Sequence, residues 1–85
     1  MDFGKALTQI KQGKQLRRKA WGNRKFIYLV PGSQFIVNRP PLHGIFPLGT
    51  PMNYAPHIDV MDNNDVAQPW VASTEDMLAE DWEQA

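Results

Sequence analysis

The sequence predicts an α+β fold: a small antiparallel sheet with a short helix near each end of the chain and a long proline-rich loop segment in the middle. Apolar residues recur at helical spacing near the start, and runs of β-branched and aromatic residues fill the centre. A capping-box pattern follows near the end. Because 85 residues correspond to one domain, we expect residues 1–85 to form a single domain.

The string DFGKALTQIKQG predicts the first helix. Its apolar residues share one face at helical spacing: Phe3, Ala6, Leu7 and Ile10. Asp2 can cap the start of this helix, and Gly13 is suited to the position just after its end.

Three segments in the first half of the chain favour extended structure. KQLRRKAW suits a first strand, and WGN at residues 21–23 suits a turn because Gly and Asn accept a positive φ. Residues 26–30 are the clearest strand, and residues 35–37 are another. The intervening PGS, residues 31–33, predicts a hairpin-like turn between them.

The central segment contains five prolines in the seventeen residues from Pro40 to Pro56. Proline lacks the amide donor that a helix interior or a central strand needs, so we expect neither structure here. Long irregular loops in small domains are usually functional or disordered. A rigid loop also lowers the ordering cost of binding, so this segment is suited to lining a pocket or contacting a neighbouring subunit.

Extended structure resumes after the prolines. HIDVMD alternates, with Ile58 and Val60 in phase, and DNND at residues 62–65 predicts a turn. VAQPWVA predicts a last strand, in which Pro69 indicates an edge or a bulge.

The string STEDMLAEDW predicts the second helix. Ser73 and Asp76 have the spacing of a capping box. Met77 and Leu78 are expected on the inner side of this helix, with Trp82 beyond its end.

The net charge is zero, but the charges are separated along the chain. All nine Lys and Arg lie between Lys5 and Arg39, and Asp2 is the only acid in the first half of the chain, so the net charge of that half is about +8. The other eight acids lie in the second half, whose net charge is about −8. One interpretation is that the halves neutralise each other within the fold or across a subunit contact. The other is that the basic half presents an anion site.

Catalytic and metal motifs are missing from the sequence. There is no cysteine, no nucleophile elbow, no zinc-protease motif and no phosphate-binding glycine loop. His57 and Asp59 lack a third ligand at a recognisable spacing. We therefore expect no enzyme activity, no metal and no cofactor. No signal peptide and no run of roughly 20 apolar residues occurs, which predicts a cytoplasmic protein.

Two kinds of binding function remain. Aromatic residues within a basic half are typical of a single-stranded nucleic-acid surface, although the acidic half would repel a long polyanion. A small nucleotide fits the charge balance better, since it needs a flat face for the base and one or two cations for phosphate. The candidates for such a site are Trp21, Arg39, Asn53, Tyr54, His57 and the helix start at Ser73.

Four strings carry a resemblance to a known family: DFGKALTQIKQGKQLRRKAW, FIYLVPGSQFIVNRPPL, GTPMNYAPHIDV and PWVASTEDMLAEDW. Together they resemble the second class of small phage anti-Thoeris proteins, in both order and spacing. The resemblance implies a sponge that binds a cyclic ADP-ribose signal from a TIR-domain immune enzyme in the host cytoplasm without cleaving it. It also implies homotetramers with pockets shared between protomers and, for some members, a separate pocket for cyclic dinucleotides.

The resemblance extends to particular positions. It implies that Trp21 stacks on a base in the ADP-ribose pocket. The family often reads Trp-Asn-Gly where this chain reads WGN, which leaves the role of Asn23 open. The other ligand-binding residues that it implies are Arg39, Asn53, Tyr54, His57, Asp59 and, at the start of the second helix, Thr74, Asp76 and Met77.

Overall fold

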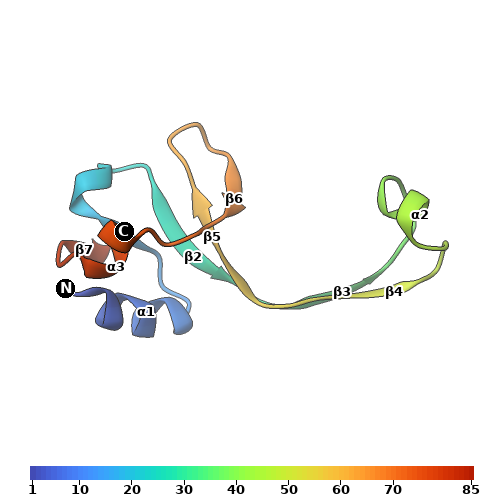
Figure 1. The fold of residues 1–85 in the computed structure, drawn as a ribbon, viewed down its shortest axis with the longest axis horizontal. Helices are drawn as coiled ribbons and strands as arrows, with labels where there is room; N and C mark the ends of the chain where they lie inside the picture. Colours follow the sequence, from blue (N-terminus) through green and yellow to red (C-terminus); the bar gives the residue numbers. More distant parts are fainter.

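The computed structural model describes all 85 residues and confirms the α+β prediction. The elements in chain order are α1 (Phe3–Lys11), β1 (Leu16–Arg18), the 3-10 turn η1 (Lys19–Trp21), β2 (Phe26–Val30), β3 (Ser33–Ile36), α2 (Leu42–Ile45), β4 (Pro51–Tyr54), β5 (His57–Met61), β6 (Ala67–Pro69), α3 (Thr74–Leu78) and β7 (Trp82–Gln84). A five-stranded antiparallel sheet has the order β6-β5-β2-β1-β7, and β3 and β4 form a separate two-stranded sheet (Figure 1). None of the helices has the length and apolar character that a membrane crossing requires.

The first helix begins and ends as its sequence predicts. The Asp2 side chain accepts a hydrogen bond from the Lys5 amide at 2.9 Å, which satisfies one of the free donors of the first turn. Gly13 has a φ of +90°, a conformation that glycine adopts without steric cost. The helix buries Ala6 and Ile10 against the sheet.

The core is small and lies between α1 and the five-stranded sheet. Its buried members are Ala6, Ile10, Leu16, Ile27, Val60 and Trp82. Trp82, which is 2% exposed, lies in edge strand β7 opposite Arg18, and its indole N–H donates to the Asp76 carbonyl at 2.9 Å. The sequence places Trp82 beyond the last helix but does not predict this strand.

The predicted strand at residues 26–30 is confirmed as β2, but the predicted hairpin-like turn at residues 31–33 is wrong, because β2 does not turn back to pair with β3. It pairs with β5 as far as Val30 opposite His57, and β3 pairs with β4 from Ser33 opposite Tyr54, in one continuous register. The chain therefore forms a single long ribbon with a break, and the PGS segment is no hairpin turn. In this register Pro31 lies opposite Pro56, so the ladder loses both amide donors at the same place.

The outer half of the ribbon, residues 33–54, forms what we call the arm; the rest of the chain is the body. The arm projects from the body, with α2 at its far end (Figure 1). The molecule measures 47 × 25 × 21 Å and has a radius of gyration of 15.9 Å. A compact chain of this length would have a radius of gyration of about 12 Å.

The proline segment contains more regular structure than its sequence predicts. Pro40 and Pro41 precede the single turn of α2, where a helix needs no amide donor. Pro51 is the first residue of β4, opposite the end of β3. These three prolines thus lie at the starts of short elements, where a missing amide donor does no harm. The prediction that the segment contains no helix and no strand is therefore wrong for α2 and β4.

The last helix confirms the capping box but not its predicted inner face. Ser73 Oγ accepts from the Asp76 amide at 3.0 Å, and the Asp76 carboxylate accepts from the Ser73 amide at 3.4 Å. Met77 and Leu78 are exposed. This part of the body is instead held to β1 by Arg18, whose guanidinium pairs with Asp76 in α3 and with Asp81 after it.

Ion pairs join the basic half of the chain to the acidic half. Arg17 pairs with Glu83 at 3.1 Å, Arg24 pairs with Asp65 at 3.6 Å, and Arg18 pairs with Asp81, Asp76 and Glu75 at 2.8, 3.1 and 3.4 Å. For these arginines the interpretation of internal neutralisation is confirmed. Arg39 forms no ion pair.

Candidate functional site

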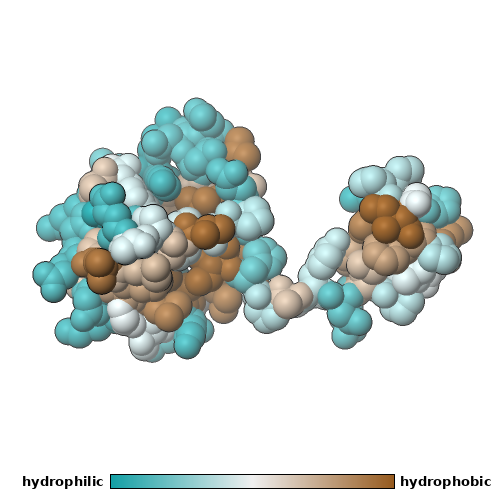
Figure 2. Space-filling view, in the orientation of Figure 1, coloured by the Kyte–Doolittle hydropathy of each residue, from teal (hydrophilic) through white to brown (hydrophobic).

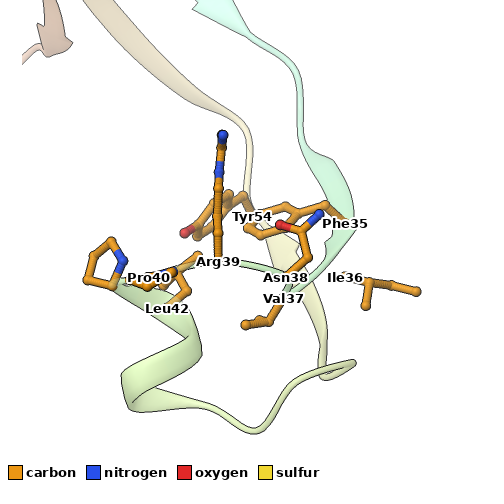
Figure 3. Close-up of a pocket in the computed structure, with 9 residues that line it drawn as sticks. Phe35, Ile36, Val37, Asn38, Arg39, Pro40, Leu42 and Tyr54 are labelled. Carbon is orange, nitrogen blue, oxygen red and sulfur yellow. The ribbon is translucent and has the colours of Figure 1, made fainter.

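The larger of two cavities, about 950 Å³, lies in the arm. Its lining residues are Phe35, Ile36, Val37, Asn38, Arg39, Pro40, Pro41, Leu42 and Tyr54 (Figure 3). They come from β3, from the connection to α2 and from the end of β4. The size suits a small organic ligand such as a nucleotide.

The ribbon positions the aromatic wall of this cavity. Phe35 on β3 and Tyr54 on β4 have ring centroids 5.2 Å apart at an angle of 51°. The pairing continues past the strands, since the Val37 amide donates to the Thr50 carbonyl and the Gly49 amide donates to the Val37 carbonyl, both at 2.9 Å. Val37 is 1% exposed, so it anchors this end of the arm.

Arg39 supplies the only formal charge of the arm. Its carbonyl accepts from the His43 amide at 3.0 Å, so the first turn of α2 fixes its backbone. Its guanidinium has no acid partner and extends away from the turn (Figure 3), and Tyr54 lines the same cavity. An unpaired guanidinium in a cavity that two aromatic rings also line has the chemistry to hold a phosphate while a base stacks nearby.

Asn53, His57 and Asp59 lie along the ribbon beneath the cavity. Asn53 is exposed on β4, opposite Gln34. His57 follows the proline break, with Nδ1 3.2 Å from the Ala55 carbonyl and Nε2 3.3 Å from Asp59 Oδ1. That Asp59 oxygen is buried and has no hydrogen bond of good geometry.

Trp21 lies at the other end of the molecule, against the core. Its ring centroid is 5.1 Å from that of Trp82 and 6.5 Å from that of Trp70, both in edge-on geometry. Lys25 Nζ lies 4.5 Å from its ring centre and covers one face. Asn23 is exposed beside it, and its carbonyl accepts from Arg17 at 3.5 Å. A base that stacked on Trp21 would have to displace the Lys25 ammonium or use the other face.

The three predicted residues of the last helix share the body with Trp21. Thr74 and Met77 are exposed. The Asp76 carboxylate is already bound by Arg18 and by the Ser73 amide. Asp76 also borders the second cavity, of about 440 Å³, with Lys25, Asn63, Asn64, Gln68 and Trp70 among its other lining residues.

Only two of the predicted site residues, Arg39 and Tyr54, line the larger cavity together. The sequence reasoning missed Phe35 and Asn38, which line the same cavity. The signal for Phe35 was its place in a strand that ends just before the Arg-Pro-Pro corner. No three His, Asp or Glu side chains are grouped closely enough to hold a metal ion.

The strongest electrostatic interaction lies in the body, outside the larger cavity. A hydrogen bond from Arg18 lowers the pKa of the Asp81 carboxyl, and the Ala20 amide adds to this effect; partial burial opposes it. The same carboxylate raises the pKa of the Arg18 guanidinium, with Asp76 and Glu75 contributing. These interactions stabilise the body, and Arg18 is therefore not free to bind a ligand.

Comparison with known proteins gives consistent matches over the whole chain. The sequence model of the Thoeris anti-defense 2-like domain matches residues 1–85. A curated protein of Bacillus phage SP01, named Thoeris anti-defense 2, is 30% identical over 94 residues, which cover 98% of this chain and 92% of that protein. The similarity thus includes both the body and the arm.

Proposed function

The chain belongs to the Thoeris anti-defense 2-like family, and on that premise we propose that it is a phage anti-defence sponge. It binds a cyclic ADP-ribose-type signal, of which glycocyclic ADP-ribose is the expected form, and holds it without cleavage. The immune effector then lacks its activator. Residues 1–85 act as one nucleotide-signal-binding domain in the host cytoplasm, without enzyme activity and without a cofactor.

The observation that carries this proposal is the cavity of the arm. It combines one free guanidinium, on Arg39, with two aromatic rings, on Phe35 and Tyr54. Arg39 is proposed to bind a phosphate, and Tyr54 to stack on the base. Asn38 and Asn53 offer amides for ribose hydroxyls.

The remaining predicted residues form a second proposed contact region. Trp21, Asn23, Thr74, Asp76 and Met77 lie in the body, and His57 and Asp59 lie between the two regions. A family member that also binds cyclic dinucleotides would need two separate regions of this kind. We propose that Trp21 stacks on a base in the body region, so that one chain offers the two regions that two ligand classes need.

The alternative function, binding of single-stranded nucleic acid, finds less support in the ion pairs. Arg17 and Arg18 are held by acids of the second half of the chain, at 3.1 Å or less. They are therefore not available for a row of phosphates, which a nucleic-acid surface requires. A small dianion needs only one or two cations.

A sponge acts by stoichiometry, so tight capture and slow release matter more than turnover. We propose that the protein assembles as a homotetramer, which places several capture sites on one particle. The small core of each chain is consistent with stabilisation by association, since chains of this size bury only about 60–65% of their unfolded surface.

The decisive experiment separates capture from cleavage. The protein is incubated with the product of a TIR enzyme, filtered to remove free signal, and then heated. Intact signal released from the denatured protein is the expected result; altered signal would mean an enzyme, and no retained signal would contradict capture. The same experiment is repeated with Arg39→Ala, which is expected to retain less signal. Lys11→Ala is its matched control, because Lys11 is an exposed cation without an ion pair at the end of α1.

A further inference from the structure

The ladder of the long ribbon is interrupted at the base of the arm. The β2–β5 pairing ends with Val30 opposite His57, and the β3–β4 pairing begins with Ser33 opposite Tyr54. Figure 2 shows the body and the far end of the arm as two separate masses joined by a narrow neck. The position of the arm, and of the cavity that it carries, therefore depends on the contacts that side chains make beside this interruption.

The imidazole of His57 lies beside the interruption and contacts both sides of it. Nδ1 is 3.2 Å from the carbonyl oxygen of Ala55, the residue that follows the arm. Nε2 is 3.3 Å from Oδ1 of Asp59, which belongs to the five-stranded sheet of the body. The ring thus lies between an acceptor on the arm side of Pro56 and an acceptor on the body side.

Both neighbours of the ring only accept hydrogen bonds. A backbone carbonyl has no proton to donate, and neither has an ionised carboxylate. Oδ1 of Asp59 is buried and accepts no hydrogen bond from any other group. A neutral imidazole has one N–H and can donate to one of the two oxygens, whereas a charged imidazole has two and can donate to both. The positive charge also attracts the carboxylate of Asp59.

No other charged group of the sheet faces this pair. On β2, Val30 lies opposite His57 and Tyr28 lies opposite Asp59; on β6, Pro69 lies opposite Asp59. A phenol carries no charge between pH 5 and 8, and the side chains of valine and proline never do. None of the other ion pairs includes His57 or Asp59.

We propose that His57 is a positioning residue that braces the base of the arm, and that the brace is strongest when the ring carries both protons. It acts through Ala55 and Asp59 and need not touch a ligand. Histidine gains and loses its second proton between about pH 5 and 8. The brace is therefore complete at the acidic end of this range and loses one of its two donors as the pH rises. The arm then opens more often, while the sheet of the body is unaffected.

The brace affects the capture site because the two strands of the arm hold its aromatic wall. Phe35 lines the cavity from β3 and Tyr54 lines it from β4. An arm that opens more often presents this pair for less of the time, and the apparent affinity falls in proportion. Capture is then tighter at pH 5.5 than at pH 8. This consequence rests on the proposed function, whereas the brace itself does not.

The test compares amide exchange in the arm and in the body of the full chain without ligand. Amides of the β3–β4 ladder report on the arm, and amides of the β2–β5 ladder around Ile27 and Val60 report on the body. Both are corrected for the intrinsic exchange rate at each pH. The ratio of arm protection to body protection is expected to fall roughly two- to fivefold from pH 5.5 to pH 8, the effect of a partly exposed ion pair.

Three variants assign this effect to the ring. His57→Gln removes the group that gains and loses the proton, so its ratio is expected to be independent of pH. Asp59→Asn is expected to do the same, because an amide can donate to the unprotonated ring nitrogen. His43→Gln is the matched control, since His43 is the only other histidine and is exposed in α2 without an ion pair. It is expected to keep the wild-type profile.

Folding of the variants can be followed independently of the arm. All three tryptophans lie in the body, so their fluorescence during urea unfolding reports on the body alone. The variants are expected to unfold at the same urea concentration as the wild-type protein at pH 8. Should His57→Gln fail to fold, the pH profiles of the wild-type protein and of Asp59→Asn still decide the question.

Each contrary result has a distinct meaning. A ratio that stays constant with pH in the wild-type protein overturns the brace. A pH dependence that survives His57→Gln or Asp59→Asn, or that disappears in His43→Gln, overturns it as well. Capture of the signal is measured separately by calorimetry at both pH values: a pH-dependent arm that binds no signal contradicts the proposed function and leaves the brace standing.

Discussion

Arg18 and Asp81 form the shortest ion pair in the molecule, with 2.8 Å between Nε and Oδ1. The second oxygen of Asp81 accepts from the Ala20 amide at 3.2 Å. Arg18 also reaches Asp76, so one guanidinium joins strand β1 to the start of α3 and to the residue before β7. Its side chain is only 12% exposed. This one residue therefore links strand β1, early in the sequence, to the segment near the C-terminus that contains Asp76 and Asp81.

The protein is expected to lose stability in acid through Asp81. Its pKa is lowered in the folded state, chiefly by the Arg18 hydrogen bond, so its contribution is fully present above the ordinary carboxyl value of about 3.9 and is lost as the pH falls through the folded value. Melting temperatures between pH 7 and pH 2 measure this effect. Asp81→Asn is expected to melt lower at pH 7 and to show a smaller decrease below about pH 4. Parallel curves for the two proteins would refute the role of Asp81.

Trp82 and Trp21, two of the three tryptophans at the core, are expected to differ in their effect on stability. Trp82 is 2% exposed and is a member of the buried cluster, whereas Trp21 is partly buried against it. Trp82→Ala should cost about 3–5 kcal/mol, a large part of the stability of a small domain. Trp21→Ala should cost less in urea unfolding but weaken capture by roughly 5- to 150-fold if a base stacks there, about 1–3 kcal/mol. Unchanged capture by a folded Trp21→Ala protein would remove Trp21 from the site.

Arg39→Ala is expected to weaken capture without lowering the melting temperature. The guanidinium has no protein partner to lose, so its removal leaves the fold intact. A hydrogen bond to a charged group contributes about 1.5–3 kcal/mol, which corresponds to a loss of roughly tenfold to a hundredfold in affinity. Calorimetry with Lys11→Ala alongside separates this contact from a general effect of charge. Equal affinities for Arg39→Ala and Lys11→Ala would show that Arg39 holds no phosphate.

Gly32 at the base of the arm is expected to be sensitive to substitution. A Cβ at this position would lie 2.9 Å from the Tyr54 carbonyl oxygen, so the backbone that presents Tyr54 has to shift. Gly32→Ala should therefore reduce capture. Gly44→Ala is the control, because a Cβ there meets nothing within 4 Å and alanine favours the helix α2 by roughly 0.5–1 kcal/mol. The prediction fails if both variants capture the signal equally well.

Salt is expected to affect capture only modestly. A small ligand held by one or two cations releases few counterions, whereas a nucleic acid contacting 6–10 phosphates would lose roughly 10³–10⁵ in affinity between 50 and 200 mM salt. Titrations of the cyclic signal and of a random oligonucleotide at both salt concentrations measure the difference. Tight, steeply salt-dependent binding of the oligonucleotide would favour the alternative function.

The features predicted correctly from the sequence are those that depend only on residues close together in the chain. The Asp2 cap, the turn at Gly13 and the capping box at Ser73 depend on neighbours within a few residues, and all three are present. The placement of Pro69 on an edge strand also follows from its missing donor. These features need no knowledge of the tertiary fold.

Long-range pairing accounts for what the sequence analysis could not predict. PGS reads locally as a turn, yet β2 and β3 continue in one direction, because β3 pairs with β4 inside the proline segment and β2 pairs with β5 just after it. Trp82 is buried because a short edge strand brings it back to β1, and nothing within STEDMLAEDW indicates that strand. The arm cavity likewise depends on Phe35 and Tyr54 meeting across the ribbon.

The facing pair Pro31 and Pro56 divides the molecule into two units that can open separately. No ladder hydrogen bond crosses this position, so fraying of the arm need not disturb the sheet of the body. Amide hydrogens of the arm should therefore exchange with deuterium much faster than those of β2 and β5 in a dissociated chain. Protection of arm amides then becomes a direct measure, residue by residue, of how much of the protein is engaged with a partner or a ligand.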